Sequence, residues 1–296
     1  MARIKLYWQS KLVLLLVLPF AGAGVVLQAH WWAENSWPVA VWTLGLSLLL
    51  ALAVLEVGAA TPAAAFTGAV LTASLIFSTA TFTSAGVIAY SPWHTALVPL
   101  LAVVALTLIA TRVGRRSKER QGTAEQRRGR TAAQVAANLG VAALASSEVV
   151  QSGLIEAGWV HPAPRILLTL GLAALAEAAA DTVSSEIGQV LGGRPRMMTT
   201  LRTVEPGTDG AVSLAGTLAG VASAVIVAAA GSWALSGGRV IFAVSCAGGI
   251  FGMFFDSLLG ATLERRGWLN NDAVNFLSTA ASAAFGLGVL VALPKS

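Results

Sequence analysis

Residues 39–55 read VAVWTLGLSLLLALAVL and carry no charged side chain. A helix that crosses the hydrocarbon core of a bilayer needs about 20 predominantly apolar residues, because each residue adds about 1.5 Å of length. Eight more segments have a comparable apolar character: residues 12–28, 62–89, 95–110, 131–151, 164–182, 210–231, 239–263 and 272–293. The sequence therefore predicts an all-α, polytopic transmembrane helical bundle with about nine spans.

The composition agrees with a chain that is mostly surrounded by lipid. Of its 296 residues, 56% are hydrophobic and 11% are charged, and the mean hydropathy is +0.74. A soluble domain carries about 25% charged residues. We therefore expect a single transmembrane domain over residues 1–296, with no soluble domain attached. The basic residues before segment 12–28 resemble a secretory signal, but everything downstream is also apolar, so we expect an uncleaved first span.

The net charge of +5 is clustered in a few connections. Basic residues mark the cytoplasmic ends of spans. We therefore place the N-terminus, the basic loop 112–130, the loop 194–202 and the turn 265–266 on the cytoplasmic side of the plasma (inner) membrane. Two cytoplasmic loops then flank residues 131–191, so the weak segment 131–151 must cross as well. Clustered charge is a topology signal, and no nucleic-acid partner is expected.

Polar side chains recur at helical spacing in four predicted spans, although an ionisable group inside a bilayer costs about 2.5–3.5 kcal/mol. The stripes are Arg130, Gln134 and Asn138; Glu177, Asp181 and Ser184 or Ser185; Asp256; and Asn271, Asn275, Ser278 and Ser282 after Asp272. The glycine pairs Gly216 with Gly220 and Gly248 with Gly252 predict close helix packing. Each stripe has the open alternative of simply holding helices together.

Residues 193–210 read GRPRMMTTLRTVEPGTDG and connect two predicted spans. The turn at residues 206–210 leads into a helix start, which Thr208 or Asp209 is predicted to cap. Free backbone N–H groups there can instead hold an anion. An ordinary turn is the simpler alternative, just as the arginines of residues 112–128 can serve only topology or contacts with anionic lipids.

The charge-based orientation brings the four stripes and this turn to one leaflet. Mg²⁺ usually takes one or two carboxylates together with substrate phosphates, and arginine suits phosphate oxygens. A group of acids would also repel one another without a cation. The sequence therefore predicts a metal–phosphate site at the cytoplasmic ends of the helices.

Five strings in this order carry a family resemblance: RTAAQVAAN (130–138), AEAAADTVSSEIG (176–188), RPRMMTTLRTVEPGTDGAVSLAGT (194–217), GMFFDSLLGATLERRG (252–267) and NNDAVNFLST (270–279). The chain resembles the phytyl-phosphate kinase family of the vitamin E pathway and its bacterial and archaeal relatives. The resemblance covers roughly residues 60–290, so residues 60–293 form the family-like catalytic core, and the spans in 1–59 carry no motif.

The resemblance implies a nucleotide-dependent kinase that converts a prenyl monophosphate to the diphosphate, with CTP as the favoured donor. The family positions that transfer to this chain are Asp181, Ser185, Glu186, Asp209, Asp256, Asn271 and Asn275. No GxxxxGK[ST] loop is present, so the nucleotide site is not of the Walker type.

We assign roles to these residues as hypotheses. Asp181 and Asp256 hold Mg²⁺, Glu186 or Asp209 completes the shell, and Glu177 orients it. The nucleotide phosphates contact the arginines and the turn of the 193–210 connection, namely Arg194, Arg196, Arg202, Gly207, Thr208 and Gly210. The acceptor phosphate contacts Arg130, Gln134 and Asn138. The prenyl tail lies in an apolar groove between helices.

Two other classes of function remain open. Acids inside a membrane also mark ion paths, so an ion-coupled transporter is one alternative. A CDP-alcohol phosphotransferase or cytidylyltransferase is the other, although Asp209-Gly210 lacks the continuation DGxxAR. The sequence leaves open whether the chain forms a homo-oligomer.

Overall fold

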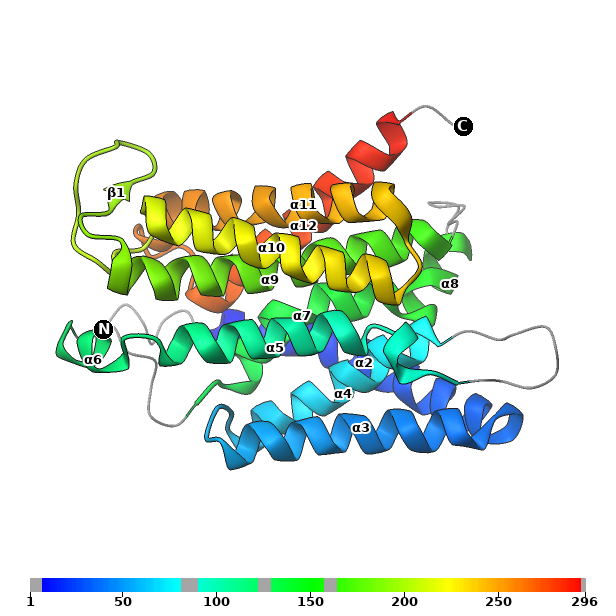
Figure 1. Cartoon of the computed structure of the whole chain (residues 1–296). Coiled ribbons are helices and arrows are strands. Elements are labelled where there is room, and N and C mark those ends of the chain that lie inside the picture. The colour runs from blue at the N-terminus through cyan, green and yellow to red at the C-terminus, as the bar shows by residue number, and fades with distance from the viewer. Residues whose placement is uncertain (1–6, 81–89, 122–128, 157–163, 294–296) are drawn as a thin grey trace.

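The computed structural model describes residues 7–80, 90–121, 129–156 and 164–293 as a bundle of long helices (Figure 1). The helices are α2 (Tyr7–Asn35), α3 (Trp37–Glu56), α4 (Pro62–Thr79), α5 (Leu97–Arg112), α6 (Arg115–Gln121), α7 (Ala132–Ser146), α8 (Glu148–Glu156), α9 (Pro164–Leu191), α10 (Leu214–Ala234), α11 (Gly238–Leu259) and α12 (Asn271–Ala292). The short elements are the 3-10 turn η1 (Pro92–His94), the π-helical turn η2 (Gly260–Glu264) and the strands β1 (Arg196–Met197) and β2 (Ala211–Val212). The predicted all-α class is confirmed.

Within the part of the chain that the structure describes, seven helices are long and apolar enough to cross a membrane: α2, α3, α4, α9, α10, α11 together with η2, and α12. The predicted fourth and fifth spans correspond to the shorter apolar helices α5 and α7. The predicted third span extends into residues 81–89, which lie outside the described residues. Apolar helices therefore occur at all nine predicted places, and seven of them have the length and composition of a span.

The weak fifth segment is shorter than predicted. Helix α7 has 15 residues, or about 22 Å at 1.5 Å per residue, against a hydrocarbon core of about 30 Å. It ends because Ser147 adopts an extended conformation (ψ 125°) before α8 begins. The Ser146 hydroxyl, in the last turn, donates a hydrogen bond back to the Ala142 carbonyl oxygen (2.9 Å). The single helix expected over residues 131–151 is therefore two helices.

Helix α9 is the central element of the bundle, and 83% of its most apolar 18-residue stretch is buried. Its run of alanines lets neighbouring helices approach closely. A Cβ atom built on Gly220 of α10 would lie 2.8 Å from the Ala180 carbonyl oxygen, and one on Gly248 of α11 would lie 3.0 Å from the Ala173 Cβ. The close packing predicted from the glycine pairs is confirmed.

Helix α9 is also longer than the apolar segment that predicted it. The expected span ended at residue 182, but the helix continues to Leu191. Asp181 and Glu177 consequently lie about three and four turns before the helix end, at 3.6 residues per turn. The structure thus places these acids within the helix instead of at its end.

Helices α4 and α7 begin side by side. Arg130 forms a parallel bridge with Ala60, in which the Arg130 N–H donates to the Ala59 oxygen (2.9 Å) and the Thr61 N–H donates to the Arg130 oxygen (3.0 Å). Gly129 permits this approach, because it has φ 73° and its Cβ would lie 2.6 Å from the Ala59 carbonyl carbon. The last residues of the basic loop 112–130 are therefore docked against the start of α4.

The basic helix α6 and the strand β1 of the 193–210 connection lie at one end of the bundle, with α8 at the opposite end (Figure 1). Helix α2 is tied to α12 near its start, where Ser10 Oγ donates to Asp272 Oδ2 (2.5 Å) and Asn270 Nδ2 donates to Ser10 Oγ (3.0 Å). The first span, which carries no family motif, is therefore bonded to a segment that does.

Candidate functional site

Three acidic side chains from two helices meet inside the bundle. Glu177 and Asp181 are four residues apart and share one face of α9, and Asp256 comes from α11. The Asp181 carboxyl interacts with those of Glu177 and Asp256. Ser278 of α12 donates a hydrogen bond from Oγ to Asp256 Oδ2 (3.2 Å). We call Glu177, Asp181 and Asp256 the carboxylate cluster.

The carboxylate cluster has unused capacity for a cation. Glu177 is 1% exposed, and its Oε1 has no hydrogen-bond partner among the described residues. Leaving a buried carboxylate oxygen without a partner is unfavourable, and neighbouring carboxylates repel one another. The cluster is thus suited to bind a cation or to retain protons.

The carboxylate cluster suits Mg²⁺ only if substrate phosphates and water supply the remaining ligands. Within the described ranges, no three His, Cys, Asp or Glu side chains are arranged to hold a metal ion by themselves. Mg²⁺ is commonly bound by one or two carboxylates and completed by substrate phosphates and water. Asp181 and Asp256, which come from different helices and face one another, match that pattern.

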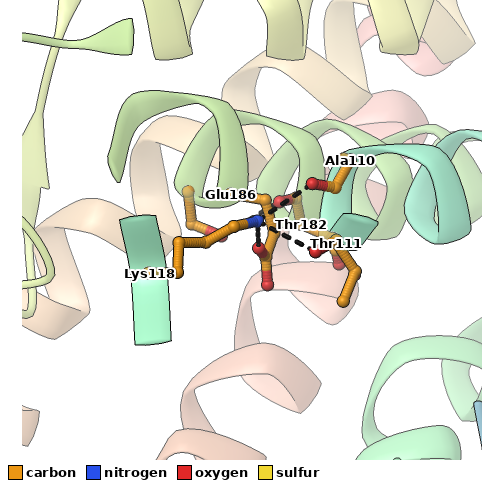
Figure 2. Close-up of polar contacts among 6 residues, drawn as sticks. Ala110, Thr111, Lys118, Thr182 and Glu186 are labelled. Carbon is orange, nitrogen blue, oxygen red and sulfur yellow. Dashed lines mark hydrogen bonds and ion pairs between the residues drawn. The ribbon is translucent and has the colours of Figure 1, made fainter. Parts of the chain in front are cut away.

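Glu186 lies apart from the carboxylate cluster. It follows Asp181 by five residues and forms an ion pair with Lys118 of α6 (Figure 2). Lys118 is 1% exposed, and its Nζ also donates to the carbonyl oxygens of Ala110 (3.0 Å) and Thr111 (3.1 Å) at the end of α5. The predicted ligand Glu186 is therefore engaged in holding α5, α6 and α9 together.

The buried ion pair of Lys118 was not predicted from the sequence. Lys118 lies in a run of arginines, and such a run is ordinarily a solvated loop. Its partner is 68 positions away, so no local pattern distinguishes it from its neighbours.

The three residues predicted to hold the acceptor phosphate have different surroundings in the structure. Arg130 lies within electrostatic range of Asp181. Gln134 instead completes the N-terminal capping box of α7 with Thr131, whose N–H donates to Gln134 Oε1 (2.7 Å). Asn138 donates from Nδ2 to the Gln134 carbonyl oxygen (2.8 Å). Arg130 and Asn138 line a cavity between α3, α4, α5 and α7, and Gln134 does not.

The 193–210 connection folds into a small hairpin. Arg196 pairs with Val212 and Met197 with Ala211. Strand β2 keeps the chain extended after Gly210, so α10 begins at Leu214 and Ser213 caps it, accepting from the Gly216 N–H (3.1 Å). The predicted caps Thr208 and Asp209, and the predicted helix start at residue 210, are therefore wrong.

The predicted phosphate contacts on this hairpin lie on its outer surface. Arg194, Arg196, Arg202, Gly207 and Asp209 are exposed, and Thr208 is half-buried with its hydroxyl donating to the Glu205 carbonyl oxygen (2.7 Å). The predicted residues outside the hairpin differ in burial: Ser185 and Asn271 are exposed, and Asn275 is half-buried. Nucleotide binding at any of these residues stays a prediction.

Gly210 docks the hairpin against the end of α11. It has φ 73°, and a Cβ there would lie 2.1 Å from the Ala261 N in η2, five residues after Asp256. We expect Gly210→Ala to lower the thermal unfolding temperature, because positive φ and overlap together cost about 1–3 kcal/mol. Gly193→Ala is the matched control, since Gly193 also has positive φ (62°) but no atom within 4 Å of its Cβ. Equal destabilisation by the two changes would show that the contact with Ala261 contributes nothing.

Comparison with known proteins identifies relatives over most of the described bundle. The chain is 43% identical to an uncharacterized membrane protein of Methanocaldococcus jannaschii over 39% of its own length and 48% of the relative. It is 33% identical to an uncharacterized membrane protein of Synechocystis over 67% and 74% of the two chains. It is 32% identical to the chloroplastic protein VTE6 of Arabidopsis thaliana over 62% and 53%.

The matched segments span about half the length of the Methanocaldococcus and Arabidopsis relatives. No solved structure matches the chain. Residues 45–283, which include the carboxylate cluster, match the family described as integral membrane protein DUF92. The protein therefore belongs to the DUF92 family of integral membrane proteins.

Proposed function

We propose that the protein is a membrane-embedded kinase that transfers a phosphoryl group from a nucleoside triphosphate to a prenyl monophosphate of the phytyl or geranylgeranyl type, at the cytoplasmic face of the plasma membrane. The observation that carries the proposal is the carboxylate cluster, which brings acids of α9 and α11 together with Arg130 within electrostatic range of Asp181. Carboxylates for a cation and an arginine for phosphate oxygens are the components that phosphoryl transfer requires. The relationship to VTE6, together with the resemblance to phytyl-phosphate kinases, supports a kinase acting on a prenyl phosphate.

In this reaction an oxygen of the acceptor phosphate attacks the γ-phosphorus of the nucleotide. The bond from that phosphorus to the β–γ bridging oxygen breaks, and the nucleoside diphosphate leaves with the bond's electron pair. The acceptor is a phosphate whose second pKa lies near 6, so it is ionised at neutral pH and needs no strong base. The task left for the protein is positioning and charge neutralisation.

Each polar group of the site then has a stated task. Asp181 and Asp256 would hold Mg²⁺, which would neutralise charge on the transferred phosphoryl group. Arg130 would orient the acceptor phosphate beside Asp181. Ser278 fixes the Asp256 carboxyl through its hydrogen bond. The exposed arginines of the hairpin, Arg194, Arg196 and Arg202, would attract the nucleotide phosphates electrostatically. CTP as the donor rests on the family resemblance alone.

The direct test follows lipid and nucleotide together. Purified protein is incubated with Mg²⁺, geranylgeranyl or phytyl monophosphate, and CTP, UTP, ATP or GTP in turn, and the products are measured by mass spectrometry. We expect prenyl diphosphate and nucleoside diphosphate in equal amounts, with the highest rate for CTP. Release of CMP or pyrophosphate would instead assign the CDP-alcohol phosphotransferase or cytidylyltransferase class. No product across these chain lengths, from protein shown to be folded, would refute the kinase.

An ion-coupled transporter is the second candidate. It is favoured by the depth of Glu177, a fully buried acid about four turns before the end of α9. Ion flux into proteoliposomes in the absence of nucleotide, lost in Glu177→Gln, would support this function over the kinase.

A further inference from the structure

The cavity between α3, α4, α5 and α7 has one apolar part and one cationic part. Its volume is about 170 Å³, which is below the roughly 300–1,000 Å³ of sites for drug-sized ligands. The apolar part is lined by Leu50, Val54, Leu100, Val103, Val104 and Leu139. The cationic part is lined by Arg112, Arg115, Lys118 and Arg130, of which Arg115 is paired with Glu119 and Lys118 with Glu186, and none of the described lining residues is acidic. An amphiphile with a slender apolar chain and an anionic head matches these two parts.

The cationic part of the cavity is a built structure. Lys118 is 1% exposed and is held by Glu186 and by the last carbonyl groups of α5. Helix α5 supplies Arg112 as its final residue, and Arg130 is fixed through its backbone bridge to Ala60. The cations therefore come from separate segments that are each fastened to the bundle.

The cavity also reaches helix α9, which carries two acids of the carboxylate cluster. Ala178, which lines the cavity, lies on α9 directly after Glu177. Arg130 lines the cavity and is within electrostatic range of Asp181. A head group held by Arg130 would consequently lie at the part of the cavity nearest Asp181, with its chain extending toward Leu50 and Leu100.

We infer that this cavity binds a single-chain lipid phosphate, with the part of the chain nearest the head group between α3, α4, α5 and α7 and the phosphate at Arg112 and Arg130. The inference rests on the proposed function for the identity of the ligand as the phosphoryl acceptor. It adds the location of the site, and it separates the acceptor from the nucleotide, whose predicted contacts lie on the exposed hairpin at residues 193–210.

Gly68 provides a way to fill the cavity without disturbing the fold. It lines the cavity on α4, and a Cβ there would meet only Val135 Cγ1, at 3.9 Å. Gly68→Leu therefore places a side chain in the cavity with no backbone overlap, and leucine is the better helix former. Gly45→Leu on the exposed face of α3 is the matched control, since no atom lies within 4 Å of its Cβ.

The experiment measures binding to the full-length protein in detergent without nucleotide or Mg²⁺, using radiolabelled geranylgeranyl monophosphate. We expect Gly68→Leu and Arg112→Gln each to raise the Kd at least about tenfold, as expected for loss of the cavity and of a charge-assisted hydrogen bond, and Gly45→Leu to leave it unchanged. Unlabelled geranylgeraniol, inorganic phosphate and two-chain phosphatidic acid should compete weakly.

Three outcomes would overturn the assignment. The first is wild-type binding by Gly68→Leu. The second is phosphatidic acid competing as well as the single-chain phosphate, which would make the cavity a site for bilayer lipid. The third is full competition by inorganic phosphate, which would make it a free-anion site.

Binding as expected without turnover would refute the kinase and leave the site standing. Turnover with an unchanged KM for the lipid in Gly68→Leu would refute the site and leave the kinase standing.

Discussion

Asp181→Asn and Asp256→Asn are each expected to reduce prenyl diphosphate formation by at least about 10²-fold, the effect seen when one group that stabilises transition-state charge is removed. Asparagine keeps the shape of aspartate and an amide oxygen but removes the negative charge that would hold Mg²⁺. The loss should appear in kcat, because the charge acts on the transferred phosphoryl group. The measurement is the initial rate of nucleoside diphosphate release at saturating lipid and nucleotide.

The same two changes are expected to leave the protein at least as stable as the wild type. Each removes one charge from a group of three interacting carboxyls, and like charges at short distance destabilise the folded state. Thermal unfolding in detergent should therefore show an unchanged or higher transition temperature. This combination of inactivity with retained stability distinguishes a reaction centre from acids that merely hold helices together.

Glu34→Gln is the control for charge removal. Glu34 lies near the end of α2, with its side chain 65% exposed beside His30. We expect wild-type turnover and stability from this variant. Near wild-type turnover in either Asp181→Asn or Asp256→Asn would mean that the carboxylate cluster is not where phosphoryl transfer takes place.

The arrangement of apolar helices could be predicted because lipid imposes a simple requirement on composition. Apolar length, however, reports the part of a helix that lies in lipid and not the whole helix. Residues 183–191, which include two serines, a glutamate and a glutamine, continue α9 beyond its apolar segment. Conversely, residues 131–151 have enough apolar character for one span, but the extended backbone at Ser147 divides them. Helix ends therefore depended on local backbone geometry that hydropathy does not encode.

The candidate site could be predicted where it depends on helical spacing. Glu177 and Asp181 share a face because they are four residues apart, and that prediction needed no tertiary information. The positions of Glu186 and Arg130 depend on contacts between segments far apart in the sequence. Glu186 is paired with Lys118, and Arg130 is brought to Asp181 by the packing of α7 on α9. The cavity was not predicted either, because its walls come from helices that are far apart in the sequence.

Lys118→Met is expected to destabilise the protein more than any other single change on the basic segment, by about 3–5 kcal/mol, the cost of removing one partner from a buried ion pair. The Lys118 ammonium has three N–H donors, and its acceptors include the Ala110 and Thr111 carbonyl oxygens and the Glu186 carboxylate. Carbonyl groups in the last turn of a helix lack intrahelical donors and favour a cation. Methionine has a side chain of similar volume but no N–H group, so these acceptors lose the lysine as a donor.

The double variant Lys118→Met with Glu186→Gln tests whether the cost comes from the orphaned charge. Removing both charges should recover part of the lost stability, because the remaining amide no longer carries an unpaired buried charge. Arg116→Met is the control: Arg116 is exposed on the same helix, and its loss should change stability by less than about 0.5 kcal/mol. Thermal unfolding in detergent is the measurement for all three.

If Lys118→Met unfolds at the same temperature as Arg116→Met, the ion pair does not fasten α6 to α9. If this contact does not hold Arg112 at the cavity either, the KM for the lipid phosphate should also be unaffected. A rise in that KM in Lys118→Met, with kcat unchanged in the folded fraction, would instead connect the ion pair to the placement of the cations.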